Sequence, residues 1–119
     1  GVYNKSFSSP TMNNVTATAT DGANNYGVYN LSSSSPTMNN VTATATGGTN
    51  GYGVYNNSSS STIRNSSLTG TGANDLNFSI QTNGQQAAYL AHTTLDGTVG
   101  PVTECVGVYN ASFVEINCD

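Results

Sequence analysis

The first 26 residues of the chain are repeated almost letter for letter in the next 26, and this repeat constrains the fold more than any other feature. Residues 1–26 and 27–52 differ at only five positions. The motif GVYN opens both copies and returns at 53–56 and 107–110. A fixed period of this length indicates a repeat architecture, in which each copy is one structural unit that stacks on the next.

Each repeat carries the alternation of a β-strand rather than the spacing of a helix. The segment 15–20 reads Val-Thr-Ala-Thr-Ala-Thr, with strand-forming residues at every second position. Turn-forming stretches rich in Gly, Asn and Thr, such as 22–25 and 47–51, follow the strands. A unit of about three short strands and three turns is one coil of a parallel β-solenoid.

We therefore predict an all-β fold, a single-stranded right-handed parallel β-helix of about 4–5 rungs of 26–27 residues each. The right hand follows from the rule for parallel crossover connections. One domain is expected over 1–119, with rungs at about 1–26, 27–52, 53–78 and 79–106 and a partial closing rung at 107–119. Because Gly1 begins within the repeat and no signal-peptide pattern precedes it, we expect a mature product or a piece of a longer chain.

Alignment of the degenerate repeats separates the core from the surface. Leu68 and Leu95 fall in the column of Ala17 and Ala43, so this column is predicted to face inward. Two further inward columns are Met12, Met38, Ile63 and Leu90, and Val2, Val28, Val54, Ile80 and Val108. The outward columns, as candidate interfaces, are the tyrosines Tyr3, Tyr29, Tyr55 and Tyr109, the threonines Thr18, Thr44 and Thr69 with Asp96, and a parallel column of Thr20, Thr46, Thr71 and Thr98.

Asparagines align at two bends of the repeat, where stacked amides can hydrogen-bond from rung to rung. Asn14, Asn40 and Asn65, with His92, are predicted at inward bends, where they could not carry a glycan. Of the N-x-S/T sequons, the candidate glycosylation sites are Asn4, Asn30, Asn56, Asn57, Asn77 and Asn110.

The repeat GVYN-x-S-x-S-S-P-T-M-N-N-V-T-A-T-A-T and the closing segment LDGTVGPVTECVGVYN resemble those of a known architecture. They are similar to the right-handed parallel β-helix repeats, pectate-lyase-like, of large secreted bacterial proteins of surface or fibre type. The resemblance implies a fold and leaves function open, because that architecture hosts adhesins, fibres, surface filaments and polysaccharide lyases.

Charge is sparse, which argues against several functions. Lys5 and Arg64 face six carboxylates, so the chain has no basic stripe for nucleic acid. No apolar run is long enough to span a membrane. The acids and His92 do not converge in the repeat alignment, and no metal or cofactor pattern appears, so we predict a non-enzyme without catalytic residues, metal or cofactor.

Cys105 and Cys118 lie close to the end of the sequence. Two buried free thiols are one interpretation. A disulfide is favoured, because it would tie down a fraying chain end and because the composition is typical of extracellular proteins. Such a bridge would stabilise the fold by roughly 3 kcal/mol.

Two classes of function follow as hypotheses. The first is an extracellular or cell-surface structural subunit that self-associates end to end into a filament, the N-terminal end of one copy meeting the disulfide-tied end of the next. The alternative is a glycan-binding adhesin or fibre tip that uses the tyrosine stripe. Ice binding through the threonine columns is a third hypothesis.

Overall fold

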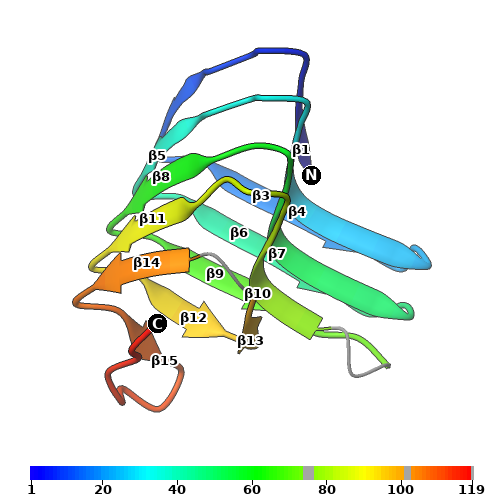
Figure 1. The fold of residues 1–119 in the computed structure, drawn as a ribbon. Helices are drawn as coiled ribbons and strands as arrows, with labels where there is room; N and C mark the ends of the chain where they lie inside the picture. The colour runs from blue at the N-terminus through cyan, green and yellow to red at the C-terminus, as the bar shows by residue number, and fades with distance from the viewer. Residues whose placement is uncertain (74–76, 101–102, 119) are drawn as a thin grey trace.

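The chain forms a parallel β-solenoid of about 4 turns. The structure is a computed structural model that describes residues 1–73, 77–100 and 103–118. Within this described part there are strands and no helix. The coil runs from an N-terminal rung at one end to the C-terminal residues at the other (Figure 1). The predicted all-β solenoid is confirmed.

Three parallel sheets form the sides of the coil, and each rung contributes one strand to each sheet. Sheet A contains β1 (Val2–Lys5), β4 (Asn24–Leu31), β7 (Asn50–Asn57), β10 (Asn77–Asn83) and β13 (Thr98–Val99). Sheet B contains β2 (Thr11–Asn13), β5 (Thr37–Asn39), β8 (Ser61–Arg64), β11 (Ala88–Ala91) and β14 (Thr103–Val106). Sheet C contains β3 (Thr16–Thr20), β6 (Thr42–Thr46), β9 (Ser67–Gly70), β12 (Thr94–Asp96) and β15 (Tyr109–Asn110).

The first three rungs stack in the register of the sequence repeat. Val28 pairs with Val2 on one side and Val54 on the other. Met38 pairs with Met12 and then with Ile63 in the same way. Equivalent residues of successive repeats therefore lie directly above one another.

The rungs become shorter in the last turn, and here the predicted boundary at residue 107 is wrong. Ile80 pairs with Val99, and Thr98 lies on sheet A beside Phe78 instead of continuing a threonine column. The cause is a sharper corner: Gly97, with φ of 130°, alone separates β12 from β13. That conformation favours glycine, because a β-carbon would clash with the backbone. The last layer therefore begins near Thr98.

Shortening of the last turn moves the final GVYN motif to another side of the coil. Tyr109 pairs with Thr94 on sheet C, and Asn110 pairs with Leu95. Val108 is fully buried, but it does not belong to the valine column of sheet A. The same GVYN motif thus lies on sheet A in the first three rungs and on sheet C at 107–110, because the last turn contains fewer residues.

The core is narrow, and most of it consists of the predicted inward columns. Val41, Ala45 and Ala88 also belong to it, whereas Val2 is only partly buried. The buried set is Met12, Ala17, Val28, Met38, Val41, Ala43, Ala45, Val54, Ile63, Leu68, Ile80, Ala88, Leu90, Leu95 and Val108. Sheets A and C approach closely at the glycine of the GVYN motif. A β-carbon on Gly27 would lie 2.6 Å from the carbonyl oxygen of Gly53 and 2.9 Å from the amide nitrogen of Thr44. The motif therefore needs glycine at its first position.

Candidate functional site

The described residues contain no cluster of three or more His, Cys, Asp or Glu side chains that could hold a metal ion. Among the same residues no helix is long and apolar enough to cross a membrane. The features with functional potential are surfaces of the coil, two asparagine columns and the two ends.

Sheet A carries six aromatic rings that form one continuous cluster, which we call the aromatic ladder. Its members are Tyr3, Tyr26, Tyr29, Tyr52, Tyr55 and Phe78. Two consecutive residues of β4, Gly27 and Val28, are buried, which interrupts the usual alternation of inward and outward side chains. Tyr26 before them and Tyr29 after them therefore both point away from the core. Two interlocked columns result where the sequence predicted one stripe.

The rings of the aromatic ladder cover one another's faces. Tyr26 and Tyr52 are stacked with centroids 5.1 Å apart and planes 12° apart, and Tyr52 and Phe78 stack at 6.0 Å and 7°. Tyr55 lies edge-on against Tyr52 at 5.0 Å. Such contacts stabilise the sheet beyond the area that they bury.

Burial and crowding also shift the ionisation of this ladder. Burial raises the pKa of Tyr26 above its usual value, and repulsion from the neighbouring tyrosinates adds to the shift. The pKa of Tyr55 is raised for the same reasons, although the Asn83 side-chain amide opposes the shift by donating a hydrogen bond of 2.7 Å to its hydroxyl. Folding therefore favours the neutral form of the Tyr26 and Tyr55 phenols.

Three of the four predicted interface tyrosines belong to the aromatic ladder, and the fourth does not. Tyr3, Tyr29 and Tyr55 lie in register on β1, β4 and β7. Tyr109 is 40 % exposed on sheet C and lies outside the ladder. Phe78 joins the ladder through its pairing with Tyr52, which could have been found from the repeat by aligning it with Tyr26.

The predicted threonine column lies on the outer face of sheet C. Thr44 pairs with Thr18 and with Thr69, and the next position in this column is Asp96. Inward alanines between these threonines keep the side chains alternating strictly. The column is uncharged over three rungs and ends at the carboxylate.

The asparagine column of sheet A is buried, although its members were predicted to be candidate glycosylation sites. Asn30 and Asn56 are fully buried and Asn4 is 8 % exposed. The Asn4 side-chain nitrogen donates to the Asn30 oxygen at 2.9 Å, and that of Asn30 donates to the Asn56 oxygen at 2.8 Å. Because each amide nitrogen is used inside the core, none of the three is an accessible glycan acceptor in the folded chain.

The corner column Asn14, Asn40, Asn65 and His92 was predicted to face inward, and this is wrong. All four residues are exposed and have positive φ, between 47° and 55°. Asparagine tolerates this left-handed conformation better than most residues, which explains its repetition at the corner. The Asn40 amide donates to the Asn14 oxygen at 2.6 Å, whereas Asn65 donates to Asn39 at 3.1 Å.

The remaining sequons differ in accessibility. Asn57 and Asn110 are half-buried. The Asn110 side-chain oxygen accepts hydrogen bonds from the amides of Ser112 and Val114. The side chain of Asn77 lies outside the described residues.

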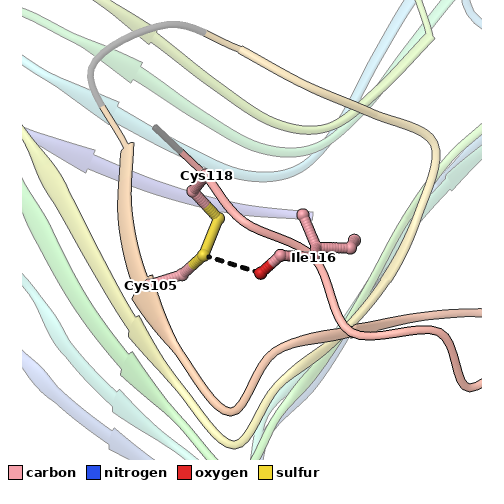
Figure 2. The surroundings of a disulfide bond; sticks show 3 residues. All are labelled: Cys105, Ile116 and Cys118. Carbon is pink, nitrogen blue, oxygen red and sulfur yellow. Dashed lines mark hydrogen bonds between the residues drawn. A yellow bond between two sulfur atoms is a disulfide. The ribbon is translucent and has the colours of Figure 1, made fainter.

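The C-terminal residues fold back across the last turn, and the predicted disulfide holds them there. Cys105 and Cys118 form a disulfide with an S–S distance of 2.01 Å, which confirms the pairing. In Figure 2 the sulfur of Cys105 lies against the carbonyl oxygen of Ile116, at 3.5 Å. A disulfide indicates a non-cytoplasmic setting.

The tail 111–118 forms a cap over this end of the coil. The amide of Ile116 donates to the carbonyl of Val108 at 2.8 Å, and Glu115 forms an antiparallel bridge with Tyr109. Ile116 packs against the core. Val114, in contrast, is 59 % exposed because the tail turns outward there.

The first rung presents three strand edges, because β1, β2 and β3 each have a neighbour on one side only among the described strands. The amide of Thr42 donates to the carbonyl of Val15. The peptide bond between Val15 and Thr16 is trans, so the Thr16 N–H points opposite to the Val15 carbonyl. This N–H therefore points away from the second rung, at the free edge of the sheet. The same reasoning applies to Thr11, because the Pro10 carbonyl accepts from Thr37.

The structure thus has an open N-terminal edge, a capped opposite end and one stacked aromatic face. The parallel solenoid is shown by the structure, while its pectate-lyase-like, secreted bacterial type stays a resemblance of the repeat. No family model matches the chain, and no curated protein or solved structure matches it.

Proposed function

We propose that the chain is an extracellular structural module of a β-solenoid fibre, with further rungs stacked on β1, β2 and β3 and with the cap closing the opposite end. The observation that carries this proposal is the difference between the two ends. One end offers three strand edges, and the other is covered by a disulfide-tied tail.

The repeat favours addition of rungs at the N-terminal edge. Three successive rungs keep one register, so a further rung of the same sequence would meet the same partners. The buried amide column could also continue in this direction, because Asn4 uses its nitrogen for Asn30 and its oxygen could accept from an equivalent amide of a further rung. An unpaired strand edge is a template for pairing with another chain.

The cap changes the geometry expected for self-association. Head-to-tail stacking would place β1, β2 and β3 of one copy against the last rung of the next, where the tail 111–118 already lies. Two copies of the chain can instead pair through their N-terminal rungs. An isologous pair of this kind closes on itself, so the chain alone would form a dimer, whereas a fibre requires further rungs stacked on β1, β2 and β3.

Glycan binding on the aromatic ladder is less favoured. Sugar rings stack on exposed aromatic faces, and the faces of Tyr26, Tyr52 and Phe78 are covered by one another. Ice binding through the threonine column is also less favoured, because the regular array ends at Asp96.

A pair of proline variants tests the structural proposal. Thr16→Pro removes an N–H that points out of the first rung, whereas Thr42→Pro removes one that bonds to Val15 inside the sheet. We expect wild-type chain to associate with rising concentration in analytical ultracentrifugation. Thr16→Pro should stay monomeric with an unchanged Tm, and the control Thr42→Pro should have a lower Tm.

Two results would contradict the proposal. A wild-type chain that stays monomeric at every concentration has no tendency to pair through its first rung. Association of Thr16→Pro equal to wild type would place the contact elsewhere on the molecule.

A further inference from the structure

The chain departs from its repeat most strongly on the outer face of sheet B. The first two rungs present only threonine and asparagine there, as Thr11 and Asn13 pair with Thr37 and Asn39. The later rungs replace these residues with charged, aromatic and apolar ones. Outward positions of β8, β11 and β14 are Thr62 and Arg64, Tyr89 and Ala91, and Glu104 and Val106.

These side chains surround a hollow of about 280 Å³. Ala91 forms its floor, because it pairs with Arg64 on one side and with Val106 on the other, and both of these side chains are longer. Tyr89 lies two residues before Ala91 on the same face of β11, and it pairs with Glu104. A short residue among long ones thus creates the depression.

Among the described residues, the ring of Tyr89 and the charged groups of Arg64 and Glu104 make no ring contact or ion pair. Tyr89 is 49 % exposed, and its ring has no aromatic neighbour among the described residues, in contrast to the aromatic ladder. Arg64 and Glu104 are both exposed, and neither forms an ion pair within the described part of the chain. The hollow therefore combines a ring face, a cationic donor and an anionic acceptor that are all available.

We infer that this hollow binds one neutral pyranose residue of a glycan. The C–H face of a sugar ring packs on an aromatic face, for which Tyr89 is placed. Sugar hydroxyls both donate and accept, so Glu104 can accept from them and Arg64 can donate to them in charge-assisted hydrogen bonds.

Charge and size restrict the ligand further. One guanidinium and one carboxylate leave the hollow without net charge, which favours a neutral sugar over a phosphate or an acidic sugar. Small-molecule sites commonly measure about 300–1,000 Å³, and the hollow of about 280 Å³ lies just below this range, so it suits a single sugar residue. The site does not depend on the proposed stacking of rungs, because it lies on the last three strands of sheet B.

Calorimetric titration of the wild-type chain with three neutral hexasaccharides, built of glucose, mannose or galactose, tests the inference. We expect saturable binding of at least one of them. Tyr89→Ala removes the ring, and Ala91→Leu fills the floor while Tyr89, Arg64 and Glu104 are kept. Each variant should raise the Kd by about tenfold or more, and a tenfold rise corresponds to a loss of about 1.4 kcal/mol of binding free energy.

Tyr109→Ala is the matched control, because Tyr109 is an exposed tyrosine on sheet C, away from the hollow. Its Kd should stay within about twofold of wild type, a difference well below 1 kcal/mol. Absence of binding to all three hexasaccharides, or equal losses in Tyr109→Ala and Tyr89→Ala, would overturn the inference. Binding of a uronic-acid hexasaccharide in preference to the neutral ones would overturn the assignment of a neutral sugar. Thermal unfolding of each variant, which should match wild type, separates lost binding from lost folding.

Discussion

Asparagine has two opposite roles in this chain, and backbone conformation separates them. At the exposed corner Asn14, Asn40 and Asn65 adopt positive φ, which few other residues tolerate. In sheet A, Asn30 and Asn56 are extended, fully buried and hydrogen-bonded to one another. A buried amide is stable only when its polar atoms have partners, so the second role depends on the rung above and the rung below.

Replacement of Asn30 tests this dependence at the scale of a residue. Asn30→Leu keeps a similar volume but leaves the Asn56 oxygen without a partner and the Asn4 nitrogen with only the weakly accepting sulfur of Met12. We expect a cost of about 2–4 kcal/mol in the free energy of unfolding. Asn24→Leu is the control, since Asn24 is exposed and bonds only to Asn50 at the surface. Urea denaturation measures both. Equal losses of stability would show that the buried column contributes nothing special.

At the scale of the element, the strands of sheet A owe their stability to stacking of side chains as well as to backbone pairing. The longest strands of the molecule, β4 and β7, each contribute two rings of the aromatic ladder. Ring centroids on neighbouring rungs are 5.1–6.0 Å apart, near the spacing of paired strands. The main role that we infer for the aromatic ladder is therefore to stabilise sheet A rather than to bind a ligand.

The raised pKa values of Tyr26 and Tyr55 predict sensitivity of this element to alkali. Because folding raises these pKa values above 10.0, the folded chain holds the phenolic protons more tightly than the unfolded chain. The stabilisation is complete below pH 10 and is lost as pH rises through the raised pKa values. Tyr26→Phe keeps the ring without the ionisable group, so it should unfold at a higher pH than wild type.

Circular dichroism during alkaline titration measures this difference. Tyr109→Phe, which lies outside the aromatic ladder, should follow the wild-type curve. Equal displacement of both curves would show that alkaline unfolding does not depend on the ladder.

At the scale of the whole molecule, the regularity of the repeat decreases from the N-terminal rungs to the last turn. The N-terminal rungs repeat at one register, the last turn is compressed at Gly97, and the tail then closes the end. A solenoid normally requires such a closing element, because its last rung has no neighbour to cover it. The disulfide fixes the tail in that position.

Removal of the disulfide should loosen this end and leave the rest in place. In Cys105→Ser/Cys118→Ser we expect a loss of up to about 3 kcal/mol of global stability. Hydrogen exchange at the Ile116 amide, which bonds to Val108, should become faster, while amides of β4 and β7 keep their protection. Faster exchange throughout β4 and β7 would show instead that the cap and the coil open as one unit. Thiol titration of the unreduced wild-type chain should find no reactive thiol among these two cysteines.

The repeat correctly predicted the coil and most of its inward columns, and the composition favoured the disulfide that the structure contains. Near-identical copies at a period of 26 residues have a strongly favoured way to bury their apolar side chains together, which is to stack in register. Strict alternation then assigned Ala43 to the core and Thr44 to the surface, as the structure shows. These features are local or periodic, and a periodic pattern can be read without knowing the tertiary structure.

The place where the repeat pattern stops could not be predicted from the sequence and is visible only in the folded chain. One glycine corner at Gly97 shortened the last turn, so Tyr109 and Val108 left their expected columns although their motif is unchanged. The hollow around Ala91 likewise arises from three strands distant in sequence. The position of a residue in a solenoid depends on the summed length of every turn before it. A change in the length of one turn therefore displaces all later residues, and the local sequence of those residues does not reveal the displacement.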